Sequence, residues 1–152
     1  MKIFTYLIAF VFVSTLFSCG PSQENILEED KIEILNYLEE NGLQESALET
    51  STEFFYIIDE PGNLGKVPSL NSEITCNYRG FYPNGEVFDA NDDISFILGN
   101  TIEGWRQGIP LVGEGGSIQL FLPSYLCYGP AGRGAIPGNQ VLFFEVDLLK
   151  VE

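Results

Sequence analysis

The side chains that could act as nucleophiles in this sequence lack an activating base. The chain has three cysteines and no histidine, which excludes a Ser-His-Asp triad, a Cys-His pair and a zinc site with histidine ligands. Cys76 falls in an alternating strand pattern, and no histidine exists to activate either it or Cys127. Two cysteines could pair but make no disulfide framework, and we interpret both as small buried residues. Any chemistry here must therefore proceed without an imidazole.

A second chemical candidate is an acidic segment with the opening spacing of a calcium loop. Asp89, Asn91 and Asp93 stand at alternate positions. An EF-hand loop also needs glycine at its sixth position and glutamate at its twelfth, where this chain has Ile94 and Asn100. The sequence therefore favours a polar turn between two strands over a cation site.

The third candidate is the single tryptophan, Trp105, which stands between Gly104 and Gly108 in a short helical segment. For Phe88, Phe96 or Phe144 considered singly, core packing is a sufficient explanation. A lone indole on a short, glycine-flanked helix indicates a binding surface more strongly, and the wall of a pocket can also be part of the core.

Alternating apolar residues predict the strands that position these side chains. Strands are expected at 54–58, 74–79, 87–88, 94–98, 118–122 and 141–151, with a hairpin turn at 83–85 and a short helix over 102–109. Fourteen of the 16 glycines and seven of the eight prolines lie from Pro61 onward, which is typical of short strands and tight turns. The pattern predicts an α+β domain in which the helix covers one face of the sheet.

A separate helix is predicted over residues 26–41, before the strands begin. Ile32, Leu35 and Leu38 recur at spacings of three, and Gly42 can end the helix in a left-handed conformation. Three roles remain open for this helix: a spacer, a dimerisation element or a brace against the domain.

The amino terminus has the features of an export signal. Lys2 precedes a mostly apolar run over residues 3–17, which is short for a membrane-spanning helix. Residues 16–19, Leu-Phe-Ser-Cys, resemble the bacterial lipobox, which implies that lipid on Cys19 anchors the chain in the bacterial cell envelope, facing the periplasm or the cell surface. An ordinary signal peptide and an uncleaved anchor are the alternatives. We expect a signal peptide over 1–18, a lipid-anchored tether and helix over 19–52, and one domain over 53–152.

Charge and length narrow the class of protein. The chain has 22 acidic and seven basic side chains, a net charge of −15. Such a balance disfavours nucleic acid as a partner, because phosphate contacts need lysine and arginine. A chain of 152 residues is long enough to bury a core without metals or disulfides.

Six segments, in order and at matching spacing, resemble the FKBP-type immunophilin family of peptidyl-prolyl isomerases. The resemblance covers about Phe54 to Glu152. The segments are Cys76-Asn77-Tyr78-Arg79-Gly80, Phe88-Asp89, Phe96-Ile97-Leu98-Gly99 with Ile102-Glu103-Gly104-Trp105, Pro123-Ser124 with Tyr128-Gly129, Ile136-Pro137, and residues 142–149. Each segment alone is a weak signal, and their order makes the resemblance specific.

The resemblance implies a twisted, mostly antiparallel sheet wrapped over one short helix, with a proline pocket between them. The matching pocket residues are Tyr78, Phe88, Asp89, Ile102, Trp105, Tyr128 and Phe144. The family pattern makes Trp105 the floor, the two phenylalanines walls, and Asp89 with Tyr78 a polar corner. It also implies that the Ile102 N–H and the Tyr128 hydroxyl hydrogen-bond the carbonyl groups of the ligand.

The implied activity is cis–trans isomerisation of peptide bonds before proline, which breaks no covalent bond and needs no nucleophile, metal or cofactor. The implied partners are proline-containing polypeptide clients, macrolide inhibitors and, through Cys19, a membrane. Arg133, Thr101 and Ile94 depart from the family pattern and alter the pocket rim. Two alternatives stay open: a non-catalytic chaperone or scaffold that binds proline peptides, and a structural part of an envelope machine for motility or secretion.

Overall fold

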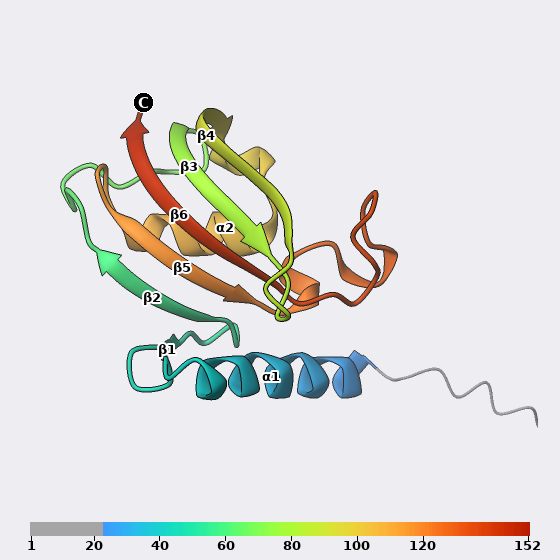
Figure 1. Ribbon diagram of the computed structural model, residues 1–152. Helices are drawn as coiled ribbons and strands as arrows, with labels where there is room; N and C mark the ends of the chain where they lie inside the picture. Colours follow the sequence, from blue (N-terminus) through green and yellow to red (C-terminus); the bar gives the residue numbers. More distant parts are fainter. Residues whose placement is uncertain (1–22) are drawn as a thin grey trace, which may run out of the picture.

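Among residues 23–152, six strands form one antiparallel sheet in the order β1-β2-β5-β6-β3-β4 (Figure 1). The computed structural model describes residues 23–152. The strands are β1 (Leu48–Glu49), β2 (Phe55–Glu60), β3 (Glu73–Phe81), β4 (Val87–Ile97), β5 (Ser117–Leu122) and β6 (Leu142–Val151). The signal peptide and Cys19, predicted from the first residues, lie outside the described part of the chain.

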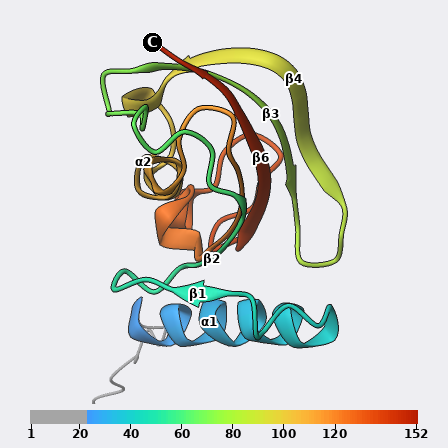
Figure 2. The ribbon, with the colours of Figure 1, turned by 90° about the vertical axis from the view of Figure 1, so that its left-hand side faces the viewer.

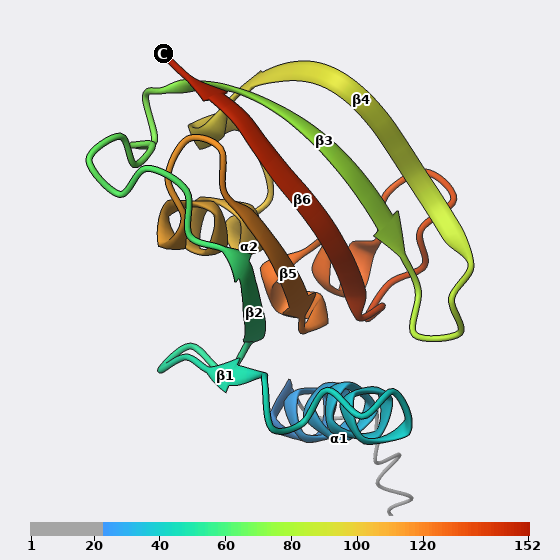
Figure 3. The same ribbon diagram turned by 60° about the vertical axis from the view of Figure 1, so that its left-hand side comes forward.

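In the described part of the chain two α-helices accompany the sheet, α1 (Gln23–Glu40) and α2 (Glu103–Gly108). Short 3₁₀ turns add Leu98–Asn100, Ile109–Leu111, Ser124–Leu126 and Gly129–Ala131. The predicted α+β class is confirmed: a curved sheet wraps over one short helix and a longer helix precedes it, as the turned views make plain (Figures 2 and 3). Within residues 23–152, none of the helices has the length and apolarity that crossing a membrane requires.

One prediction about the strands is wrong, because residues 87–97 form a single strand and not two strands joined by a polar turn. Tyr78 pairs with Asn91 while Cys76 pairs with Ile94, so two residues of β4 oppose one residue of β3. This β-bulge places Asp93 at φ 53°, and the Asp93 N–H donates to the side-chain oxygen of Asn77 at 2.9 Å. The acidic segment is therefore a continuous strand, bent at the bulge.

Glycines allow α2 to lie close against β5. A Cβ atom at Gly104 would stand 2.3 Å from Leu122, and one at Gly108 would stand 2.5 Å from Leu120. Four residues apart, the two glycines occupy one face of the helix. The Trp105 side chain between them belongs to the hydrophobic core formed by α2 and the concave face of the sheet.

Helix α1 covers a row of phenylalanines on the opposite face of the sheet. Phe55, Phe121, Phe143 and Phe81 are successive cross-strand partners on β2, β5, β6 and β3. The ring of Tyr37, on α1, lies 4.6 Å from that of Phe143, centroid to centroid. The row would otherwise face water, so of the three roles left open for this helix the structure supports the brace.

The buried face of α1 differs from the predicted one. Ile34 and Leu38 are buried, whereas Ile32 and Leu35 are exposed. The spacing-of-three pattern through Ile32 and Leu35 was misleading, because the true stripe includes a charged residue, Asp30, one turn before Ile34. Asp30 is almost fully buried and fixes this face of the helix.

Asp30 joins α1 to the loop between β5 and β6. Its Oδ2 accepts a hydrogen bond from the Ser124 N–H at 2.8 Å and another from the Ser124 hydroxyl at 2.6 Å. Burial raises the pKa of Asp30 above its ordinary value of 3.8; the two hydrogen bonds oppose that rise, and nearby Glu29 adds to it. The folded protein therefore holds a proton on this carboxyl more tightly than the unfolded chain does.

An Asp30→Asn variant should become more stable relative to the native protein as pH rises from 3.8. Because the pKa of Asp30 is higher in the folded protein than in the unfolded chain, ionisation of Asp30 lowers the free energy of unfolding. This decrease in stability begins near pH 3.8 and grows with pH until the carboxyl of the folded protein is fully ionised. The neutral amide keeps an oxygen for Ser124 and does not titrate. Urea unfolding of both proteins at several pH values measures the difference. The prediction would be contradicted if the difference in the free energy of unfolding did not depend on pH, or if it came to favour the native protein as pH rises.

Candidate active site

Trp105 lies at the centre of a cage of aromatic rings. Its ring centroid is 5.3 Å from that of Tyr78, 5.6 Å from Phe144 and 5.9 Å from Phe96, with interplanar angles of 83–89°. Such edge-to-face contacts hold each ring in one orientation. The indole is only 4% exposed, and its Nε1 has no hydrogen-bond partner within residues 23–152. The cage thus presents a rigid apolar surface with one unsatisfied donor.

Phe88 extends this surface from β4. Its ring lies 5.6 Å from that of Phe144 at 86° and 5.1 Å from that of Tyr82. Gly80, on β3, lies directly behind: a Cβ there would meet the Phe88 ring at 2.6 Å and the Phe144 ring at 3.0 Å. The positions of both predicted walls therefore depend on the glycine at position 80, which has no side chain to displace them.

A polar corner stands beside the cage, as the sequence predicts. The Tyr78 hydroxyl donates to Asp89 at 2.6 Å, and the Asn91 amide donates to the Tyr78 hydroxyl at 2.9 Å and to Asp89 at 3.3 Å. Burial, and then the hydrogen bond to Asp89, raises the pKa of Tyr78 to about 12. The hydroxyl stays protonated at neutral pH and fixes the carboxylate. The sequence analysis considered Asn91 only as part of a calcium loop and not of this corner, although its alternate spacing from Asp89 indicates the same face of a strand.

The segment that leads into α2 is tied down by Arg106. Ile102 is the N-cap residue, so its own N–H precedes the helix, where backbone donors have no intrahelical acceptor. The Arg106 guanidinium donates to the Thr101 carbonyl at 3.1 Å and forms an ion pair with Glu103. Thr101, which departs from the family pattern, donates its hydroxyl to the Leu98 carbonyl at 2.7 Å. Sequence reasoning assigned no role to Arg106, which fixes the position of the Ile102 backbone.

Tyr128 lies on the loop between β5 and β6, packed against the same core as Trp105. The Arg133 guanidinium is 5.5 Å from the centre of its ring. Burial raises the pKa of Tyr128; Arg133 opposes the rise, and the charge of Asp89 adds to it. Arg133, the second departure from the family pattern, therefore supports the rim of the site by covering the tyrosine.

The structure gathers the sequence-predicted residues on one side of the sheet. Direct ring contacts and hydrogen bonds connect Tyr78, Phe88, Asp89, Trp105 and Phe144. The other two predicted residues, like the third departure at Ile94, are partly buried and pack against the same core.

Neither metal nor thiol chemistry finds support in residues 23–152. The structure shows no cluster of three or more acidic or cysteine side chains there that could hold a metal ion. Both Cys76 and Cys127 are free thiols, and burial raises the pKa of each, for Cys76 to about 11. A thiol with a raised pKa carries little thiolate at neutral pH and is a poor nucleophile.

A Gly80→Ala variant tests how closely the aromatic walls are supported. The added Cβ would displace the rings of Phe88 and Phe144, so we expect a loss of stability of about 1–3 kcal/mol. Any activity that depends on these walls should fall by about tenfold or more. Gly65→Ala is the control, since a Cβ there would meet only the Asn63 side chain, at 3.2 Å. Equal behaviour of the two variants would show that the walls adjust freely.

A family model and two curated relatives that match this chain all name the same family of proteins. A family model described as FKBP-type peptidyl-prolyl cis-trans isomerase matches residues 65–149. The chain is 32% identical over 134 residues to the FKBP-type peptidyl-prolyl cis-trans isomerase FkpA of Buchnera aphidicola, covering 86% of this chain and 51% of that protein. It is 34% identical over 120 residues to FkpA of Escherichia coli K12, covering 76% and 44%. The chain thus spans about half the length of the curated relatives it matches.

Solved structures have the same fold. The crystal structure of FkpA from Escherichia coli superposes with a TM-score of 0.74 at 32% identity, covering 85% of this chain and 62% of that one. The crystal structure of a peptidyl-prolyl cis-trans isomerase from Pseudomonas syringae superposes with a TM-score of 0.74 at 24% identity, covering 88% of this chain and 98% of that one. At this identity the likeness supports the fold alone. The match of the family model over more than half of the sequence shows that the chain belongs to the FKBP-type peptidyl-prolyl cis-trans isomerase family.

Proposed function

We propose that this protein catalyses cis–trans isomerisation of X–Pro bonds in polypeptides, with the proline ring bound on Trp105. The observation that carries the proposal is the setting of Trp105 in this member of the family. Three aromatic rings contact its indole at nearly right angles, and the hydrogen-bonded pair of Tyr78 and Asp89 lies beside it. Membership of the family implies proline-containing substrates.

The chemistry requires binding and desolvation rather than bond breaking. Amide resonance gives the X–Pro bond a rotational barrier of ~18–20 kcal/mol. Twisting the bond removes resonance and makes the carbonyl less polar. A dry aromatic surface favours this less polar state over the planar one, and each 1.36 kcal/mol of preferential binding raises the rate about tenfold.

The residues divide this work between holding and orienting the substrate. Trp105, Phe88 and Phe144 would hold the pyrrolidine ring so that the preceding carbonyl can rotate. The Ile102 N–H and the Tyr128 hydroxyl would donate hydrogen bonds to carbonyls of the bound chain. Because burial raises the pKa of Tyr128, its hydroxyl remains a donor at neutral pH.

The tryptophan itself reports on the pocket. Trp105 is the only tryptophan of the chain, so all indole fluorescence comes from the proposed floor of the site. A titration with a short X–Pro peptide should change this emission in a saturable way. The same peptide with alanine in place of proline should change it much less. An identical response to both peptides would contradict proline recognition at Trp105.

We also propose that the protein works in the bacterial cell envelope, where lipid on Cys19 would anchor it and exported proteins would be its clients. The support is the export-signal pattern of residues 1–18 and the lipobox-like segment that follows. Expression of the full chain with a labelled fatty acid tests the anchor. The native chain should take up the label and sediment with membranes, and Cys19→Ser should do neither. Labelling of the variant, or none of the native chain, would count against the anchor.

A further inference from the structure

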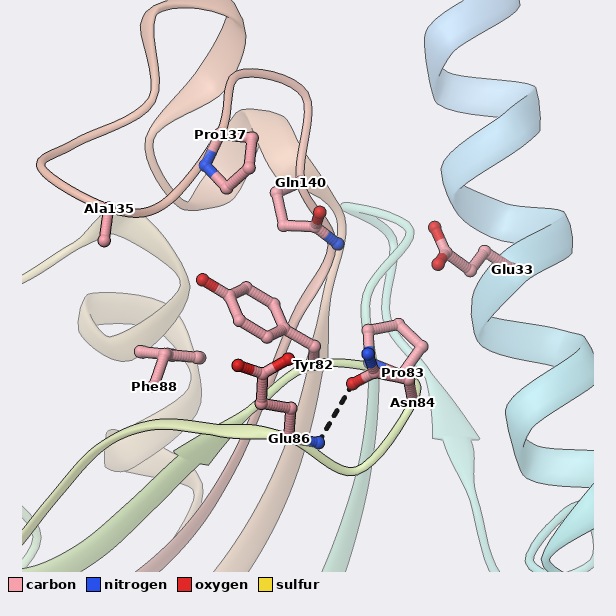
Figure 4. Close-up of a pocket in the computed structure, with 9 residues that line it drawn as sticks. All are labelled: Glu33, Tyr82, Pro83, Asn84, Glu86, Phe88, Ala135, Pro137 and Gln140. Carbon is pink, nitrogen blue, oxygen red and sulfur yellow. Dashed lines mark hydrogen bonds between the residues drawn. The ribbon is translucent and has the colours of Figure 1, made fainter.

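A groove of about 540 Å³ lies beside the aromatic cage (Figure 4). Its walls come from three segments distant in sequence: helix α1, the β3–β4 turn with the start of β4, and the loop before β6. The lining residues include Glu33, Tyr82, Glu86, Phe88 and Pro137. The volume is of the size that holds a small ligand or a short peptide segment.

The groove is continuous with the proposed proline site through one ring. Phe88 lines the groove and also contacts Phe144 of the cage at 5.6 Å. Tyr82, which contacts Phe88 at 5.1 Å, continues the aromatic surface into the groove. A polypeptide bound at Trp105 can therefore pass over Phe88 and enter the groove without leaving the protein surface.

Two carboxylates give the groove a negative charge. Figure 4 shows Glu33 extending from α1 on one side of the groove, and Glu86 on the β3–β4 turn. Neither forms an ion pair within residues 23–152. Partial desolvation and the nearby Asp30 carboxylate raise the pKa of Glu33 above its ordinary value.

Cations elsewhere in the described chain are already engaged. Five of them pair with carboxylates: Lys31 with Glu49, Lys66 with Glu114, Arg79 with Glu145, Arg106 with Glu103, and Lys150 with Glu152. The remaining one in residues 23–152, Arg133, covers the ring of Tyr128. A cation that neutralises the groove would therefore come most readily from a bound molecule.

We propose that this groove is a second binding site for the substrate polypeptide, and that it selects a lysine or arginine side chain flanking the isomerised X–Pro bond. The inference rests on the proposed isomerase function and adds a preference among substrates. The aliphatic stem of such a side chain would lie on Tyr82 and Pro137, and its charged end would approach Glu33 or Glu86. The aromatic rings would add cation–π attraction.

Matched peptides test the preference. One substrate is a short X–Pro peptide that does not extend beyond the proline site. The others are longer peptides in which each residue flanking the X–Pro bond is replaced in turn by lysine or by glutamine. The protein should turn over the best lysine peptide about three- to tenfold faster, in kcat/KM, than its glutamine counterpart, as expected for one or two solvent-accessible charge contacts. Added salt should reduce the ratio. The fluorescence of Trp105 gives the affinity of each peptide in parallel.

Two double variants separate the groove from the overall charge. Glu33→Gln with Glu86→Gln should abolish the lysine preference and leave the short peptide unaffected. Glu40→Gln with Glu45→Gln removes the same charge outside the groove and should retain the preference. If the protein does not accelerate isomerisation of the short peptide, the isomerase proposal fails. The groove proposal is then tested by comparing the affinities of the lysine and glutamine peptides. If the native protein does not distinguish lysine from glutamine, or if both variants lose the preference equally, the groove proposal is wrong.

Discussion

The Trp105→Leu variant should lose most of the proposed isomerase activity while keeping its fold. We expect kcat/KM to fall by about ten- to a hundredfold, which corresponds to about 1.4–2.7 kcal/mol of transition-state stabilisation. The reason is geometric: the indole contacts Tyr78, Phe96 and Phe144 edge to face. Leucine would leave these rings without their common support and would offer the proline ring a smaller, more mobile surface. Relaxation of a cis X–Pro peptide measures the change.

Phe121→Leu is the matched control for this experiment. It also replaces a buried aromatic residue by leucine, but on the face of the sheet that α1 covers. It should reduce stability and leave kcat/KM nearly unchanged. Circular dichroism and thermal unfolding establish that both variants are folded at the assay temperature. A Trp105→Leu protein that is folded and fully active would overturn the assignment of Trp105 as the floor of the site.

The second large effect is expected on stability, from Leu38→Ala on helix α1. Leu38 is 1% exposed and packs in the cluster around the phenylalanine row. Truncating a buried leucine to alanine costs about 2–5 kcal/mol, and the loss should lower Tm by roughly 10 °C. Thermal unfolding or urea titration provides the measurement.

Leu35→Ala separates a brace from a solvent-facing helix. Leu35, on the same helix, is 37% exposed, and alanine is an equal or better helix former. Its substitution should cost less than about 1 kcal/mol. If the two variants are equally stable, α1 does not brace the sheet through Leu38 and acts as a spacer or a dimerisation element instead.

Local pattern was sufficient for most of the strands and for the short helix, because their apolar residues alternate or recur at the period of the element. It divided β4 into two strands and did not indicate β1. It was insufficient for α1. There the buried stripe contains Asp30, whose burial depends on Ser124, 94 residues away. No spacing of apolar residues reveals such a partner. The β4 bulge was missed for a similar reason, since it depends on pairing with Asn77 and not on β4 alone.

The covered outer face of the sheet did leave a signal in the sequence. Phe54-Phe55 and Phe143-Phe144 are doublets, and adjacent residues of a strand point to opposite faces. Both members of each doublet are buried, so both faces of the sheet must be covered. The pattern therefore indicates that a second layer covers this face, although it does not identify α1 as that layer or give its register.

The candidate site was predicted in its aromatic part and missed in its supports. Trp105 and the residues around it were found through the order of the family-like segments. Gly80, Asn91 and Arg106 act through contacts with those residues, and such contacts become visible only in the folded chain. The groove likewise joins three segments that lie far apart in the sequence.

The most direct test of the central claim is catalysis itself. A short peptide with a cis X–Pro bond is mixed with the protein, and its relaxation to the trans form is followed over the tens to hundreds of seconds that the uncatalysed reaction takes. The relaxation rate should rise in proportion to protein concentration. If the rate stays at the uncatalysed value while Trp105 fluorescence shows that the peptide is bound, the site recognises proline but does not rotate the bond, and the enzymatic proposal is contradicted.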